Sequence, residues 1–192
     1  MKSQELLDEI LQIIRIVKDD QKSLTKILGF LQDEIDLPDE YYEVQLPEKY
    51  NEAVVSIADS IDAGLVCFLN TDTLETDDLP QQLFTDPSEY EAITGMTPED
   101  LQPKYTQWKN YITIEPLESG ESFRIMEKFT AQLNNLKLRN QLIDVLKNRR
   151  PFANFKKIVE SSFVRQDWFD FKAKYLQNYV KSIIEVELQK EN

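Results

Sequence analysis

The sequence predicts a mostly helical α+β protein in which a small sheet of about three strands is flanked by helices. Apolar residues recur at helical spacing over most of the chain, above all in its last third, whereas only three short stretches have the pattern of strands. The chain has 192 residues, of which 41% are hydrophobic, so it can bury a core. This length favours one domain, or one domain with a helical appendage.

Residues 1–36 are expected to form a helical hairpin or arm. Their apolar residues follow the alternating four- and three-residue steps of a coiled-coil seam: Leu6, Ile10, Ile13, Val17, Leu24, Ile27 and Leu31. Asp20 interrupts the seam, and Asp20 and Ser23 are both good N-cap residues, so two helices packed within one molecule are favoured. The alternative is a dimeric coiled coil, and the chain is therefore expected to be a monomer or a homodimer through these helices.

Residues 37–192 are expected to form a single α+β domain. Its first elements, in chain order, are predicted to be a strand over 42–46, a helix over 48–61 and strands over 65–69 and 111–114. Between the last two strands, residues 71–103 are acidic and loop-rich and contain only short helical pieces. One of these pieces opens at Thr97, a capping residue that is followed by proline at the first helical position.

The part of the chain from residue 118 to residue 188 is predicted to form a C-terminal layer of four helices, over residues 120–133, 136–147, 151–162 and 166–188. In the last of these helices the apolar residues fill an arc of roughly 220° at about 100° per residue, about twice what a helix covered on one side needs. We therefore expect this helix to be covered on two sides.

The composition excludes several kinds of catalytic and metal site. The chain has no histidine and one cysteine, Cys67, which rules out a Ser-His-Asp triad, a histidine-ligated metal, an internal disulfide and a thiolate zinc site. Its four glycines lie too far apart for a phosphate-binding loop. Asp72, Glu75, Asp77 and Asp78 match no calcium-binding loop and are interpreted as a solvated acidic turn. No catalytic residue, metal site or cofactor is therefore assigned.

The sequence also predicts a cytoplasmic protein with no membrane partner. No apolar stretch approaches the roughly 18 residues that a membrane span requires. Charged residues near the N-terminus interrupt the apolar run that a secretory signal needs. A single cysteine is typical of a reducing compartment.

Charge is distributed unevenly along the chain. Residues 1–120 contain 8 Lys and Arg against 26 Asp and Glu, and residues 121–192 contain 14 against 9, which gives −18 and +5 within the net charge of −13. Attraction between two parts of one molecule is the favoured interpretation, and two partners of opposite sign are the alternative. The negative net charge argues against nonspecific binding of nucleic acid or anionic membranes by the whole chain.

Three successive C-terminal helices place a cation on or beside their apolar face: Arg139, Lys156 and Lys172. An unpaired buried charge is very costly, so each cation must be paired, reach solvent or bind a ligand. Internal salt bridges are favoured, either to a carboxylate of the acidic half or to one such as Glu127, Asp144, Glu160 or Asp167. The alternative is that the three cations converge on an anion, such as a phosphate or carboxylate ligand.

Arg149, Arg150 and Lys157 are candidate contacts to nucleic acid, because they stand beside aromatic residues in the basic part of the chain. Phe152 and Phe155, however, occur at the spacing of a helix core, which favours packing over base stacking. Nucleic acid is therefore an alternative partner and not the expected one.

Several short motifs in the C-terminal part resemble those of a bacterial "uncharacterised protein family", number one-five-eight. They are Ile125-Met126-Glu127-Lys128-Phe129, Leu138-Arg139, Pro151-Phe152-Ala153-Asn154-Phe155-Lys156 and Trp168-Phe169-Asp170-Phe171-Lys172. The resemblance covers roughly residues 111–185. The chain departs from the family pattern at Asn154, where an arginine commonly precedes the Phe-Lys pair, and at Arg150-Pro151, which replaces a small-residue turn. The family has no assigned activity, so the resemblance implies a bacterial intracellular protein of unknown function.

These observations leave three hypotheses about function. The first is a non-enzymatic binding or adaptor protein that offers its acidic N-terminal half to a protein partner. The second is a nucleic-acid-binding protein that uses its basic C-terminal helices. The third is a small-anion-binding or metal-dependent enzyme.

Overall fold

The computed structural model describes residues 3–18, 20, 23–24, 26–27, 31, 44, 46–97 and 99–190. By its contacts the chain divides into two compact units, Met1–Glu43 and Val44–Asn192.

The first unit begins with helix α1, Ser3–Ile16. Asp20 accepts hydrogen bonds from the backbone N–H of Ser23 at 3.3 Å and from its hydroxyl at 2.6 Å. Asp20 therefore caps the helical residues that follow it, as its chemistry predicts. The rest of the expected second helix lies outside the described residues.

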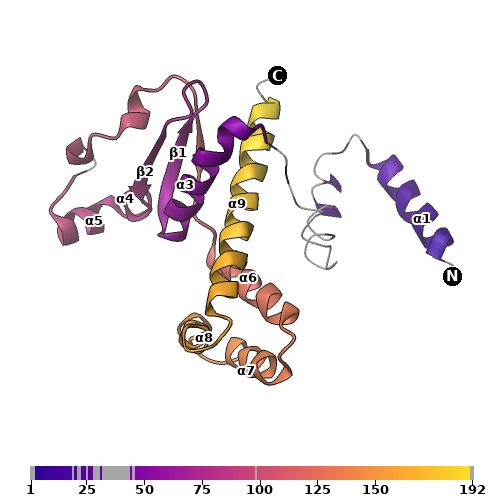
Figure 1. Ribbon diagram of the computed structural model, residues 1–192. Coiled ribbons are helices and arrows are strands. Elements are labelled where there is room, and N and C mark those ends of the chain that lie inside the picture. The colour runs from indigo at the N-terminus through magenta and orange to yellow at the C-terminus, as the bar shows by residue number, and fades with distance from the viewer. Residues whose placement is uncertain are drawn as a thin grey trace. The chain divides into compact units, whose positions relative to one another are not determined.

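The second unit combines short strands with helices (Figure 1). Its elements are η2 (Glu48–Tyr50), α3 (Asn51–Asp62), β1 (Leu65–Asn70), β2 (Thr76–Pro80), α4 (Gln82–Thr85), α5 (Pro87–Thr94), η3 (Glu99–Leu101), η4 (Lys104–Gln107), β3 (Tyr111–Ile114), α6 (Ser119–Gln132), α7 (Leu136–Leu146), α8 (Pro151–Glu160) and α9 (Arg165–Lys190), where η marks a 3-10 helix. This mostly helical architecture with one small sheet confirms the predicted fold class.

The helices begin where local capping signals stand. Helix α6 opens with a capping box, in which the backbone N–H of Glu118 donates to Oε2 of Glu121 at 3.1 Å. Asn135 caps α7 by accepting from the backbone N–H of Leu138 at 3.0 Å. Pro151 occupies the first position of α8. The four predicted C-terminal helices are confirmed, and none of their ends differs from the expected bound by more than two residues.

The sheet has strand order β2-β1-β3, and both pairs are antiparallel. The predicted strands over 65–69 and 111–114 are confirmed. The predicted strand over 42–46 is wrong, since its described residues, Val44 and Leu46, lie in no strand. The third strand is instead β2, which lies inside the stretch predicted to be an acidic loop. β2 is an edge strand, and Leu79 is its only buried residue, so it lacks the apolar run by which strands are recognised.

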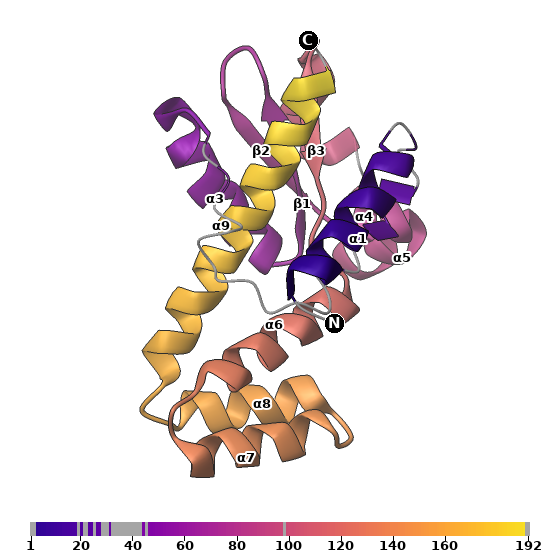
Figure 2. The ribbon, with the colours of Figure 1, turned by 90° about the vertical axis from the view of Figure 1, so that its right-hand side faces the viewer.

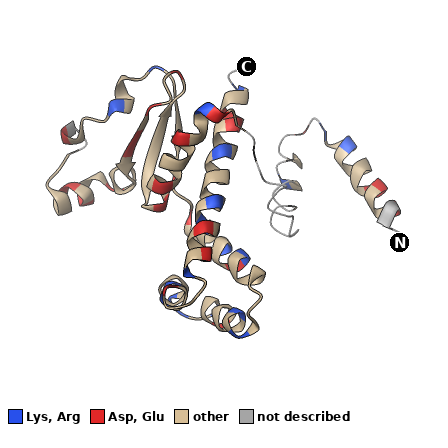
Figure 3. Cartoon of the chain, in the orientation of Figure 1, with Lys and Arg blue, Asp and Glu red and all other residues tan. Residues whose placement is uncertain are grey.

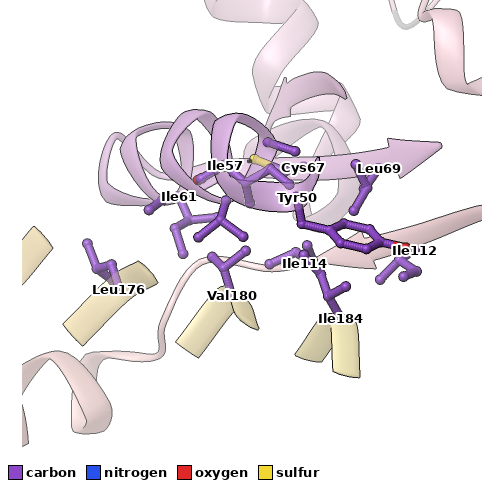
Figure 4. Close-up of a cluster of buried hydrophobic side chains, with 13 residues drawn as sticks. Tyr50, Ile57, Ile61, Cys67, Leu69, Ile112, Ile114, Leu176, Val180 and Ile184 are labelled. Atoms are coloured by element: carbon purple, nitrogen blue, oxygen red, sulfur yellow. Dashed lines mark hydrogen bonds between the residues drawn. The ribbon is translucent and has the colours of Figure 1, made fainter. Parts of the chain in front are cut away.

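One face of the sheet packs against α3 and α9. Residues of β1 alternate, so that Cys67 and Leu69 point into this core. Figure 4 shows side chains from the two helices and from β3 meeting them between the layers. The buried helical residues of this core are Ala53, Val54, Ile57, Ala58 and Ile61 of α3 and Leu176, Val180 and Ile184 of α9.

A second core lies among α6, α7, α8 and the first turns of α9. Its buried residues are Met126, Phe129, Leu138, Leu142, Leu146, Phe155, Val159 and Val164, with Trp168 and Phe171 of α9 packed against them. Figure 2 shows these helices gathered around the N-terminal end of α9. Helix α9 therefore faces the helical core with its first turns and the sheet with its later turns, which accounts for its wide apolar arc.

Candidate functional site

The acidic half of the second unit carries a long stretch without cations. Residues 50–103 contain 12 Asp and Glu and no Lys or Arg. In Figure 3 the charged residues of β2 and α5 are all acidic. A surface of one sign attracts partners of the opposite sign and repels polyanions.

Three of the four carboxylates near β2 have separate structural roles. Asp72 accepts from Nδ2 of Asn110 at 3.2 Å, Asp77 accepts from the backbone N–H of Tyr105 at 3.1 Å, and Asp78 accepts from the Ser60 hydroxyl at 2.9 Å. Each bond ties β2 or its neighbouring turn to a different segment. Within the described residues, no three potential metal-ligating side chains of the His, Cys, Asp and Glu types come together.

Cys67 lies in the sheet core with 1% of its surface exposed. Burial, followed by the nearby Asp78 carboxylate, raises the pKa of the Cys67 thiol to about 12, against a smaller opposing effect of Ser60. The thiol is therefore protonated near neutral pH, which is the state of a core residue and not that of a nucleophile.

The outer face of the sheet holds a cluster of aromatic residues. Phe68 of β1 is buried and stacks on Tyr105 with ring centroids 3.7 Å apart and an interplanar angle of 5°. Tyr111 meets both rings edge-on, and Phe84 lies 6.1 Å from Phe68 between centroids. Tyr111 and Phe84 are 43% and 48% exposed, so this cluster extends from the core to the surface.

Helix α5 is stabilised by its two caps more than by packing of its side chains. Asp86 accepts from the backbone N–H of Glu89 at 2.9 Å, and Gly95 closes the helix in the left-handed conformation with φ of 71°. None of its residues is buried. Ile93 is 75% exposed and Met96, just beyond the helix, is 47% exposed.

The structure places the three candidate anion-binding cations on three different helices, α7, α8 and α9. Lys172 forms a salt bridge with Asp62 at the end of α3. Lys156 is exposed and lies 3.7 Å from Glu160 in its own helix. Arg139 is half-buried, and among the described residues no ion pair of its side chain is seen. The described interactions do not bring the three together at a shared group.

The candidate nucleic-acid residues Arg149, Arg150 and Lys157 are all exposed. Arg150 has φ of 57°, a left-handed conformation that is uncommon for residues other than glycine. Asn154 donates from Nδ2 to the carbonyl oxygen of Arg149 at 2.9 Å and so braces this turn. Phe155 is buried, whereas Phe152 is 44% exposed and packs edge-on against Phe123. Both rings therefore pack against other aromatic residues, as their spacing favours, but only Phe155 is buried.

The exposed aromatic and apolar residues near α4 and α5 were not identified from the sequence. Their spacing has no clear period, because α4 and α5 are short, and apolar exposure is set by tertiary packing. For residues 71–103 the sequence predicts only an acidic, loop-rich stretch with short helical pieces. One sequence signal points to these residues: four large apolar residues lie within a stretch that contains no Lys or Arg. They are Phe84, Tyr90, Ile93 and Met96.

Comparison with known proteins finds no match among curated proteins or solved structures. Among the described helices, none combines the length and apolar character that crossing a membrane requires. Residues 99–188 match the model of an uncharacterised protein family, UPF0158. This segment begins at η3 and ends near the close of α9, so it includes all four C-terminal helices. This match over residues 99–188 confirms the resemblance to that uncharacterised family that the motifs predict.

Proposed function

We propose that the protein is a non-enzymatic cytoplasmic binding or adaptor protein that offers its acidic N-terminal half to a protein partner. The observation that carries the proposal is the run of 54 residues, 50–103, with 12 carboxylates and no cation. Such a surface favours a cationic partner and accelerates its encounter.

The side-chain geometry supports binding over catalysis. The cysteine is buried and protonated, and the carboxylates near β2 hold loops in place. The exposed rings of Phe84 and Tyr111 give the acidic half apolar contact points, which protein interfaces use at their centre.

The test is capture of partners from the native lysate by the full chain and by two variants. In the acidic variant, Asp or Glu is replaced by its amide at four exposed positions: Glu52, Asp59, Glu89 and Glu91. In the matched control, the same change is made at four positions of the basic half: Glu127, Asp144, Asp167 and Glu185.

We expect a stoichiometric partner that binds the wild-type chain and the control, is lost from the acidic variant, and dissociates as salt is raised. Repeated capture without a stoichiometric partner contradicts the proposal. A partner that binds both variants equally contradicts it as well.

A second candidate function is nucleic-acid binding through residues 139–174, and the exposure of Phe152 beside Arg149 and Arg150 favours it. A cation pair next to an accessible ring matches the composition of surfaces that bind single strands. The left-handed Arg150 adds to this, because uncommon backbone conformations cluster at functional sites.

This candidate is tested by the anisotropy of a labelled single-stranded oligonucleotide at low salt. Binding that weakens steeply with salt, and that Arg149→Ala and Phe152→Ala both reduce, would support it. A flat titration at low salt would remove it.

A further inference from the structure

Helix α5 presents apolar side chains that the described residues of the second unit do not cover. An isolated helix of eight residues is marginal in water, and α5 relies on its Asp86 cap and its left-handed Gly95 closure. Only Tyr90 packs partly against the outer core of the sheet. The helix is thus held in place while Ile93 stays 75% exposed.

Two further exposed apolar residues flank α5 in the chain, one on each side of the helix. Phe84 of α4 is 48% exposed and contacts the buried Phe68. Met96 is 47% exposed and follows Gly95, the residue that closes α5. We call Phe84, Ile93 and Met96 the α4–α5 surface. Phe84 packs against Phe68, which is itself stacked on Tyr105, so this residue of the surface is held in place before a partner binds.

The charge around the α4–α5 surface has one sign. Asp86, Glu89 and Glu91 are all exposed, and residues 50–103 contain no Lys or Arg. A second copy of the same surface would bring like charges together, which disfavours self-association here. Polyanions and anionic membranes are repelled for the same reason.

We propose that the α4–α5 surface is the docking site for an amphipathic, Lys- and Arg-rich segment of a partner protein. The apolar side chains of that segment contact Phe84, Ile93 and Met96, and its cations face Glu89 and Glu91. The inference rests on the proposed function and names its site and the chemistry of its partner. Burial of the apolar face supplies the affinity, while the carboxylates supply orientation and rate.

The experiment titrates the full chain with a labelled 18-residue helical peptide of Leu and Lys, in which Leu occupies one face. Two control peptides keep the same pattern, one with Glu in place of Lys and one with Ser in place of Leu. Two protein variants change the surface: Ile93→Ser with Met96→Ser, and Glu89→Lys with Glu91→Lys. Leu136→Ser with Val186→Ser is the matched control, since these residues are 69% and 50% exposed in other helices.

We expect the Leu–Lys peptide to bind the wild-type chain and the matched control, and both surface variants to weaken it roughly tenfold or more, a loss of about 1.4 kcal/mol each. All replaced residues are exposed, so circular dichroism and the thermal midpoint should stay unchanged. The two control peptides should bind far more weakly.

Three results would overturn the inference. One is equal binding of the Leu–Lys peptide by wild type and both surface variants. If the four-site acidic variant nevertheless loses that binding, the acidic half binds elsewhere, and only this inference fails. The second is absence of binding by wild type. The third is self-association in light scattering that Ile93→Ser with Met96→Ser abolishes, which would assign the surface to a second copy.

Discussion

Cys67 is a residue of the hydrophobic core and not a catalytic thiol. Its thiol lies 3.9 Å from the carbonyl oxygen of Ile57, and burial raises its pKa from 9.0 to about 12. In the unfolded chain the thiol loses its proton at lower pH than in the folded chain. Between pH 9 and about 12, the folded state therefore keeps a thiol proton that the unfolded state has lost.

We therefore predict that the free energy of unfolding is insensitive to this thiol below pH 9 and falls as pH rises from about 9 to 12. Urea unfolding of wild type and Cys67→Ala over this range measures the effect. The Cys67→Ala curve should lack that part of the decline. A thiol reagent should modify Cys67 only after unfolding, and rapid modification of the native chain would contradict the buried, protonated state.

Lys172 is the residue that best tests whether the C-terminal cations are paired within the protein or bind an anionic ligand. The structure joins it to Asp62, with side chains 30% and 41% exposed. A pair this accessible to water is screened, so its coupling is expected to be about 0.2–1 kcal/mol.

A double-mutant cycle with Lys172→Met and Asp62→Asn measures this coupling by urea unfolding. The more exposed pair Lys156–Glu160 is the control, and its coupling should be smaller. Phosphate should leave the thermal midpoint of wild type unchanged. A rise that Lys172→Met abolishes would show instead that this cation serves an anionic ligand.

Arg150 has a backbone conformation that suits glycine better than arginine, because its φ is 57°. A side chain in this conformation costs roughly 1–2 kcal/mol, whereas glycine adds an entropy cost of about 0.5–1 kcal/mol.

Arg150→Gly is therefore predicted to stabilise the chain by about 0.5–1 kcal/mol, measured by urea unfolding. Arg149→Gly is the control: this neighbour is not among the described residues with positive φ, so the same change should destabilise it. Destabilisation by Arg150→Gly would mean that the arginine side chain contributes contacts that outweigh its strained backbone.

At the scale of elements, long periodic helices were predictable and short edge elements were not. The four C-terminal helices carry apolar residues at helical spacing and local caps such as Asn135, so pattern and capping agree. β2 has no such apolar pattern, because it is an edge strand that contains Asp77 and Asp78 and buries only Leu79. Leu46, which is predicted to lie in a strand, instead packs on the sheet core, and Pro47 precedes η2 as its N-cap residue.

The candidate site was less predictable than the fold for a related reason. Cations on apolar helix faces could be named from the sequence, but the partner of Lys172 is Asp62, 110 positions earlier in the chain. Exposure is likewise a tertiary property: Phe152 and Phe155 have the same side chain and neighbouring positions, yet only Phe155 is buried. A one-dimensional pattern does not contain this information.

At the scale of the second unit, α9 links two hydrophobic cores. Trp168 and Phe171 pack in the helical core, while Val180 and Ile184 are fully buried against the sheet. Losing either core exposes one side of the same helix. The two cores should therefore unfold together, as small cooperative domains do.

The two tryptophans of the chain allow this cooperativity to be measured. Trp108 packs at the outer face of the sheet and Trp168 in the helical core, so Trp168→Phe and Trp108→Phe variants each leave one local reporter. In both backgrounds Leu142→Ala, in the helical core, should lower the free energy of unfolding by about 2–5 kcal/mol. Because α9 belongs to both cores, the unfolding transitions reported by the two tryptophans should shift to the same extent. Ile184→Ala, in the sheet core, should also shift both transitions equally. A Trp108 transition that Leu142→Ala leaves in place would show that the two cores are independent and that α9 only connects them.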